Sequence, residues 1–223
     1  MVVLFAIASG LALIGVWIWI EHTRDRKLLS VARGKALEAL PLYIPRRIGR
    51  EALMELGNVP WPDLNHAYLH LPDEPENAIG RDVALCLRRL YEGQEIAADA
   101  VEWLYGNIWH QGTIYHATAY AVPFLAAIVA GDDIERSLRA ELARMIGRIA
   151  IASSFDAPTG SHSGAWGENV AQLTREALVA SHSLLSEAAS RDPALLSLTM
   201  AIQAYAALPS QTTVDELTRC ASD

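Results

Sequence analysis

Charged side chains are missing from the first twenty residues of the chain, Met1 to Ile20. A helix of that length spans about 30 Å, which is the thickness of the hydrocarbon core of a bilayer. Trp17 and Trp19 lie at the end of the stretch, and indole rings favour the membrane interface. The absence of charge therefore predicts a single transmembrane helix over residues 1–20.

Basic residues are also missing before Arg24, and no small-residue cleavage motif follows the apolar stretch. Because a secretory signal peptide carries both features, an uncleaved anchor is favoured over a cleaved signal peptide or a buried core helix. Basic residues then follow in quick succession: Arg24, Arg26, Lys27, Arg33 and Lys35. Basic flanks stay in the cytoplasm, which predicts an outside N-terminus, cytoplasmic residues 21–223, and contact of these cations with lipid headgroups.

Cysteine is scarce, and neither Cys86 nor Cys220 has a metal-type partner nearby in sequence. Both fit a reducing compartment. The sequence therefore predicts no cofactor and no metal site.

Positive charge is scarce outside one short region. Residues 21–50 carry eight Lys and Arg against three acidic residues, a net charge of +5, whereas residues 51–223 carry ten against twenty-three, a net charge of -13. An acidic surface is repelled by nucleic acid, so we predict no nucleic-acid partner. The expected organisation is an anchor (1–20), a basic juxtamembrane helical neck (21–58) and a helical array (59–223).

Strand alternation is absent from every window, and apolar residues recur at helical spacing instead. Helices are expected over residues 24–40, 48–56, 79–91, 96–109, 114–129, 134–151, 168–189, 194–208 and 213–220, with a short one near 64. One apolar side of the helix over 96–109 is predicted to hold Ile96, Ala100, Trp103, Leu104 and Ile108.

Residues 114–129 are apolar on all sides, which predicts burial on more than one face and a kink at Pro123. Asp133 and Asp192 are expected to cap the helices that follow them. Helical hairpins over 79–109, 114–151 and 168–208 predict an all-α fold with a short α-solenoid of HEAT or armadillo type. The alternative is a closed helical bundle.

Two motifs stand out from this background. One begins at Trp61 and reads W-x-x-L-x-H-A-Y, and the other begins at His110 and reads H-Q-G-T-x-Y-x-A-T-A-x-A-V-P-F-L. Together with Trp166 and the helix that follows it, they resemble a family of bacterial HEAT-repeat proteins over roughly residues 61–208. The resemblance implies a HEAT-type fold and a scaffold-like role, and it supplies no catalytic residue. The predicted anchor and an array of only about three repeats depart from the family pattern.

The motifs provide the candidate partner-binding residues, which are Trp61, His66, Tyr68, Trp109, His110, Gln111, Thr113, Tyr115, His116 and Tyr120. In a structural interpretation, His110 and Gln111 bond helix-end carbonyls, Gly112 adopts a positive φ, and Thr113 caps the next helix. As metal ligands, His110 and His116, or His66 and His70, would need a third ligand that the neighbouring sequence does not offer.

These observations favour a membrane-anchored scaffold for protein–protein interaction, non-catalytic and part of a membrane complex. Two alternatives remain open. One is a HEAT-like enzyme or lyase acting on a protein-type or tetrapyrrole-type substrate, centred on the histidines. The other is a purely structural subunit assembled through its membrane helix.

Overall fold

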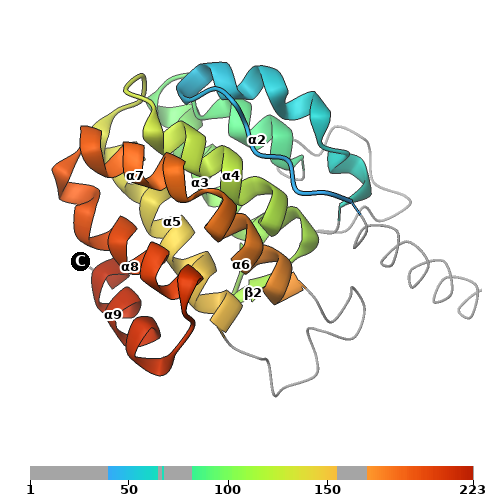
Figure 1. Cartoon of the computed structure of the whole chain (residues 1–223). Helices are drawn as coiled ribbons and strands as arrows, with labels where there is room; N and C mark the ends of the chain where they lie inside the picture. Colours follow the sequence, from blue (N-terminus) through green and yellow to red (C-terminus); the bar gives the residue numbers. More distant parts are fainter. Residues whose placement is uncertain (1–39, 65–66, 68–81, 155–169, 223) are drawn as a thin grey trace, which may run out of the picture.

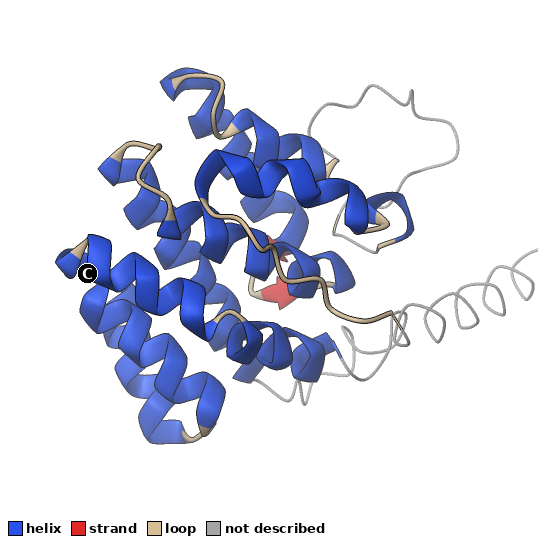
Figure 2. Cartoon of the chain, turned by 45° about the horizontal axis from the view of Figure 1, so that its top comes forward, coloured by secondary structure: helices blue, strands red, loops and turns tan. Residues whose placement is uncertain are grey.

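Helices form almost all of the regular structure in the computed structural model, which describes residues 40–64, 67, 82–154 and 170–222. The elements follow in the order η1 (Gly49–Asn58), η2 (Trp61–Asp63), α2 (Val83–Arg89), α3 (Gln94–Ile108), β1 (Trp109–His110), β2 (Thr113–Ile114), α4 (His116–Ala130), α5 (Arg136–Ser154), α6 (Val170–Ala180), α7 (His182–Arg191), η3 (Pro193–Leu195), α8 (Leu196–Ala207) and α9 (Gln211–Ser222). The all-α prediction is confirmed for these residues. Their strands, red in Figure 2, form one hairpin of two residues on each side.

The helix α4 lies in the middle of the other helices (Figure 1) and contacts α5, α6, α7 and η1. Each of its residues is buried, so the predicted burial on more than one face is confirmed. Pro123 lies inside α4, as expected. Because alanine is the commonest side chain along α4, neighbouring helices can approach it closely. A helix that is apolar on all sides must be covered on all sides, and α4 therefore organises the core.

Residues 40–58, the described part of the predicted neck, pack against α4. The ring of Tyr43 stacks on Phe124 with centroids 6.1 Å apart. The Tyr120 hydroxyl donates to the carbonyl of Leu40 at 3.0 Å. The chain that enters the domain is therefore fixed to the central helix before η1 begins.

The helix expected over 168–189 is divided into α6 and α7 at Ser181. The Ser181 hydroxyl donates to the carbonyl of Ala177, one turn earlier, at 2.7 Å. Such a bond competes with the helical ladder and bends the helix. Apolar periodicity continues through the bend, which is why the sequence pattern predicts a single helix.

The terminal helix α9 begins at Gln211 and continues to Ser222, beyond both predicted ends. Its start is fixed by a reciprocal pair of bonds: the Ser210 N–H donates to Thr213 Oγ1 at 2.9 Å, and the Thr213 N–H donates to Ser210 Oγ at 3.2 Å. This arrangement is a capping box in which threonine replaces the usual glutamate.

The two predicted aspartate caps have different outcomes. Asp192 accepts from the Ala194 N–H at 3.2 Å and caps η3, as expected. The capping of α5 by Asp133 does not occur, because α5 begins only at Arg136. Asp133 instead bonds a residue far away in sequence, the backbone N–H of Arg50, at 2.7 Å.

Candidate functional site

A groove of about 590 Å³ lies between α3 and α5, within the part of the molecule that the structure describes. The turn between α2 and α3, the segment before α5 and Arg50 also line it. Its apolar floor consists of Leu90, Ala97, Val101, Ile134 and Leu138. A volume of this size is typical of ligand sites, which span roughly 300–1,000 Å³.

The wall formed by α3 follows from helical spacing. Ala97, Ala98, Val101, Glu102 and Tyr105 line the groove and recur at intervals of three and four residues, so they share one face of the helix. The two alanines on this face fill little space and leave the groove open. The adjoining face of α3 carries Ala100, Leu104 and Ile108, which enter the core.

Negative charge dominates the groove lining. Its carboxylates come from both walls: Glu102, Asp133, Glu135 and Glu141. Arg50 is the one basic residue among the described lining residues, which leaves a formal charge of -3. The groove is therefore an apolar channel with an acidic rim.

At one end of the groove, a hydrogen-bonded cluster joins α3 to α5. The Tyr105 hydroxyl donates to Glu141 Oε1 at 2.8 Å, and Arg148 donates to the Tyr105 hydroxyl at 3.0 Å. Arg144 donates to Glu141 Oε2 through Nε at 3.1 Å and through Nη2 at 2.9 Å. The Arg148 guanidinium also lies 5.3 Å from the centre of the Tyr105 ring. This cluster sets the separation of the two helices at that end.

The cluster shifts the titration of both acidic groups. Burial raises the pKa of Tyr105, and its hydrogen bond to Glu141 raises it further. Burial alone raises the pKa of Glu141, but hydrogen bonds from Tyr105 and Arg144 outweigh that effect and lower the pKa below its ordinary value. At neutral pH the phenol is thus protonated and the carboxylate ionised, which suits a fixed structural bond rather than acid–base chemistry.

A second tyrosine–carboxylate pair lies at the other end. Asp133 accepts from the Tyr91 hydroxyl at 3.1 Å as well as from the Arg50 backbone. The Arg50 side chain lies 5.1 Å from the centre of the Tyr91 ring and donates to the Tyr91 carbonyl at 3.2 Å. Burial, followed by the charge of Asp133, raises the pKa of Tyr91. Both ends of the groove are therefore held by a tyrosine hydroxyl that donates to a carboxylate.

Tight packing positions Asp133. Gly49 adopts a φ of +61°, and a Cβ atom added there would lie 2.6 Å from Asp133 Oδ1. A Cβ atom added to Gly131 would lie 2.5 Å from the Gly49 Cα. Glycine at both positions lets the start of η1 approach the end of α4 closely enough for the Arg50–Asp133 bond.

The predicted motif residues of the hairpin lie beside this groove rather than in its lining. Trp109 and His110 form β1, and Thr113 belongs to β2. Gln111 and Gly112 make the turn with φ values of 52° and 84°, so the expected positive φ of Gly112 is confirmed. The Trp109 ring packs edge-on against Tyr105 at 5.7 Å, which is the link between the hairpin and the groove.

The predicted capping role of Thr113 is wrong. Tyr115 is the N-cap of α4, and its N–H donates to Thr118 Oγ1 at 2.7 Å. The same hydroxyl of Thr118 donates to the carbonyl of Ile108 at 2.6 Å, which joins the end of α3 to the start of α4. His116, the first residue of α4, is buried.

Two further motif residues stabilise the core. The Trp61 indole donates to the carbonyl of Leu56 at 2.9 Å and meets the Phe124 ring edge-on at 5.8 Å. Tyr120 is buried and bonds Leu40. His66 and Tyr68 lie outside the described residues, as do the predicted anchor and its flanking cations. No group of three or more metal-ligating side chains occurs in the described ranges, and no helix described there is both long and apolar enough to cross a membrane.

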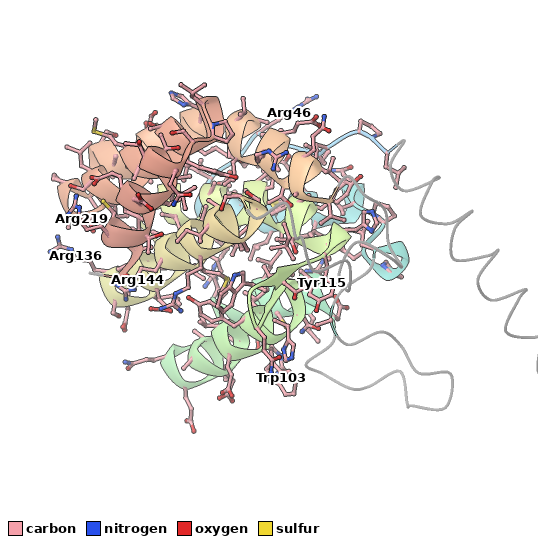
Figure 3. The ribbon with its side chains drawn as sticks, turned by 90° about the horizontal axis from the view of Figure 1, so that it is seen from below. Arg46, Trp103, Tyr115, Arg136, Arg144 and Arg219 are labelled. Atoms are coloured by element: carbon pink, nitrogen blue, oxygen red, sulfur yellow. The ribbon has the colours of Figure 1, made fainter. Side chains whose placement is uncertain are left out.

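The groove residues themselves were not among the sequence candidates. Ile96 and Trp103, expected on the buried side of α3 with Ala100, are 39% and 43% exposed. Figure 3 shows Trp103 at the outer edge of α3, away from α5. The sequence signal for the groove is the pair of alanines followed by Val101 and a carboxylate on one face of the helix. This signal is weaker than that of the aromatic motifs.

Comparisons with known proteins add no identification: no family model, curated protein or solved structure matches this chain.

Proposed function

We propose that this protein is a non-catalytic protein-binding scaffold held at the cytoplasmic face of a membrane. The groove between α3 and α5 receives a segment of its partner. The observation that carries this proposal is an apolar floor enclosed by charged groups that are engaged in fixed bonds at both ends. Such a site offers burial and charge complementarity to a ligand, and its tyrosines and their carboxylate partners are held as structural pairs.

The membrane location rests on composition. The uncharged residues 1–20 are long enough to span a bilayer, and the basic residues from Arg24 to Lys35 would lie against anionic headgroups. In this arrangement the acidic domain is held next to the membrane while its own charge keeps it off the lipid surface.

A short HEAT-like α-solenoid remains our proposal for the fold. The contacts of α4 with α5 and of α8 with α9 support it, because sequence-adjacent helices form pairs. The enclosure of α4 by several helices, in contrast, favours the alternative fold, a closed helical bundle. Membership of the bacterial HEAT-repeat family is likewise proposed from the two motifs.

The groove is tested by filling it in the full chain. Ala98 is exposed and lines the groove, so Ala98→Phe should obstruct the groove without disturbing the core. Ala204, which is equally an exposed helical alanine but lies on α8, provides the matched control Ala204→Phe. Both variants are purified in mild detergent from membranes of the native host, and the captured proteins are quantified by mass spectrometry.

We expect Ala98→Phe to reduce capture of a specific membrane-associated partner about tenfold, because a lost central contact costs roughly 1–2 kcal/mol. Ala204→Phe should leave capture unchanged. Equal capture by both variants would contradict the proposed binding site.

Carbonate extraction tests the anchor separately, since removing residues 1–20 should release the protein from the membrane pellet.

A further inference from the structure

We propose that the groove between α3 and α5 takes a basic, amphipathic helical segment of the partner protein. This inference rests on the proposed function and specifies the chemistry of the partner. It follows from the way the four carboxylates of the groove are used.

Two of the four carboxylates are already engaged. Asp133 accepts from Arg50 and Tyr91, and Glu141 accepts from Tyr105 and Arg144. The Asp133 donors are the Arg50 backbone N–H and a phenol, whereas Arg144 also compensates the charge of Glu141. Because each belongs to a hydrogen-bonded cluster, these two carboxylates maintain the shape of the groove and are not the groups that bind the ligand.

The other two carboxylates are open. Glu102 on α3 and Glu135 just before α5 are both exposed, and the described residues provide neither side chain with a hydrogen bond or an ion pair. They come from opposite walls, with the apolar floor between them. A ligand that lies on the floor therefore meets an uncompensated negative charge on each side.

This pattern selects the charge of the ligand. An anionic segment is repelled by the net charge of the lining, and a wholly apolar segment would remove water from two carboxylates without replacing it. Lys and Arg satisfy both demands, because their methylene stems cover apolar surface while their charged ends reach the rim.

The shape of the groove selects a helix. The lining residues of α3 extend from Gln94 to Tyr105, a distance of about 16 Å along the axis. That length matches roughly three turns of a second helix lying alongside. A helix presents apolar side chains at positions i, i+3, i+4 and i+7 toward the floor and leaves its flanking positions for cations.

The test is an unbiased selection against the full chain in phosphatidylcholine nanodiscs. A display library of random sixteen-residue peptides is passed over empty nanodiscs and then over the protein. We expect the enriched sequences to combine helical apolar spacing with Lys or Arg and to lack acidic residues. Their affinities are then measured by fluorescence anisotropy at low and high salt.

Matched charge variants locate the site. Glu102→Gln together with Glu135→Gln should weaken the enriched peptides about tenfold at low salt, with a smaller loss at high salt. Glu95→Gln is the control, because Glu95 is an exposed carboxylate on the same helix that does not line the groove. It should change affinity by less than about twofold.

Several results would overturn the inference. Enriched peptides that are acidic or uncharged, an absence of enrichment, or equal affinity for the double variant would each do so. Spermidine binding as tightly as the peptides would assign the groove to a small organic cation instead. The proposed function fails on a different result. If Ala98→Phe leaves capture of the native partner unchanged, the groove is not the binding site. If only the combined Glu102→Gln and Glu135→Gln variant leaves that capture unchanged, the charge requirement alone is rejected.

Discussion

Adding one methyl group at Gly49 gives the sharpest test of how the groove end is built. The φ of +61° costs an L-residue about 1–2 kcal/mol. The new Cβ would also lie 2.6 Å from Asp133 Oδ1, closer than the 3.0 Å that real Cβ atoms respect. Asp133 must then move, and its bonds from the Arg50 N–H and the Tyr91 hydroxyl weaken, each worth about 1 kcal/mol. We expect Gly49→Ala to lower the free energy of unfolding by about 3 kcal/mol.

Three other glycines separate the two causes. Gly57 has neither a positive φ nor a neighbour within 4 Å of an added Cβ. Gly57→Ala should therefore leave stability unchanged or raise it by up to about 1 kcal/mol. Gly112 has a φ of +84° and open space, so Gly112→Ala should show the conformational cost alone, about 1–2 kcal/mol. Gly131→Ala introduces overlap without a positive φ, because its Cβ meets the Gly49 backbone.

The measurement is urea unfolding of the full chain in detergent, followed by circular dichroism. The expected order of stability is Gly57→Ala at or above the wild type, then Gly112→Ala, then Gly49→Ala. If Gly49→Ala proved no more destabilising than Gly112→Ala, Asp133 would be able to turn away at no cost. The claim that this carboxylate fixes the groove end would then be refuted.

Two further predictions concern carboxylates with lowered pKa values. The folded-state pKa of Glu141 lies below its ordinary value of 4.5, so its ionised form stabilises the fold above that pH, and the contribution is lost as the pH falls through the lowered pKa. Tyr105→Phe removes one cause of the shift; unfolding at neutral pH should become about 1 kcal/mol easier, with a weaker acid dependence, and an unchanged pH profile would reject this role. Asp192→Asn removes the charge and one of the two buried oxygens that accept from Arg136, at 3.1 and 2.9 Å. It should lower the free energy of unfolding by about 1–2 kcal/mol, whereas Glu216→Gln in an exposed pair should cause a smaller loss, and equal losses would contradict this ranking.

The sequence pattern predicts those parts of the fold that depend on local periodicity. The apolar residues 114–129 identify α4 and its enclosure, because no arrangement leaves such a helix partly exposed. Asp192 is likewise recognisable in the sequence as the start of η3, because its side chain caps the N–H groups that follow it. The division into α6 and α7 at Ser181 cannot be predicted in this way. The Ser181 hydroxyl bonds a carbonyl one turn earlier, and this bond leaves the apolar pattern unchanged.

The site is harder to predict because its geometry comes from contacts between distant residues. The aromatic motifs attract attention, yet Trp61 and Tyr120 are committed to the core around α4. The bond between Arg50 and Asp133 joins residues 83 positions apart, and no local pattern indicates it. In the sequence, Ile96 and Trp103 fit the apolar spacing of a helix. In the structure they lie on the exposed side of α3, and smaller alanines line the groove facing α5.

The division of labour among the groove carboxylates connects the fold to the proposed function. Asp133 and Glu141 each accept a hydrogen bond from a tyrosine hydroxyl, and these bonds within the domain hold the groove at its two ends. A partner segment then spends little of its binding energy on ordering the site, which favours affinity from a modest surface. In the proposed complex, Glu102 and Glu135, which also line the groove, determine which charge is accepted. Stability and selectivity are therefore assigned to different carboxylates, so losing the open pair should change binding while leaving the fold intact.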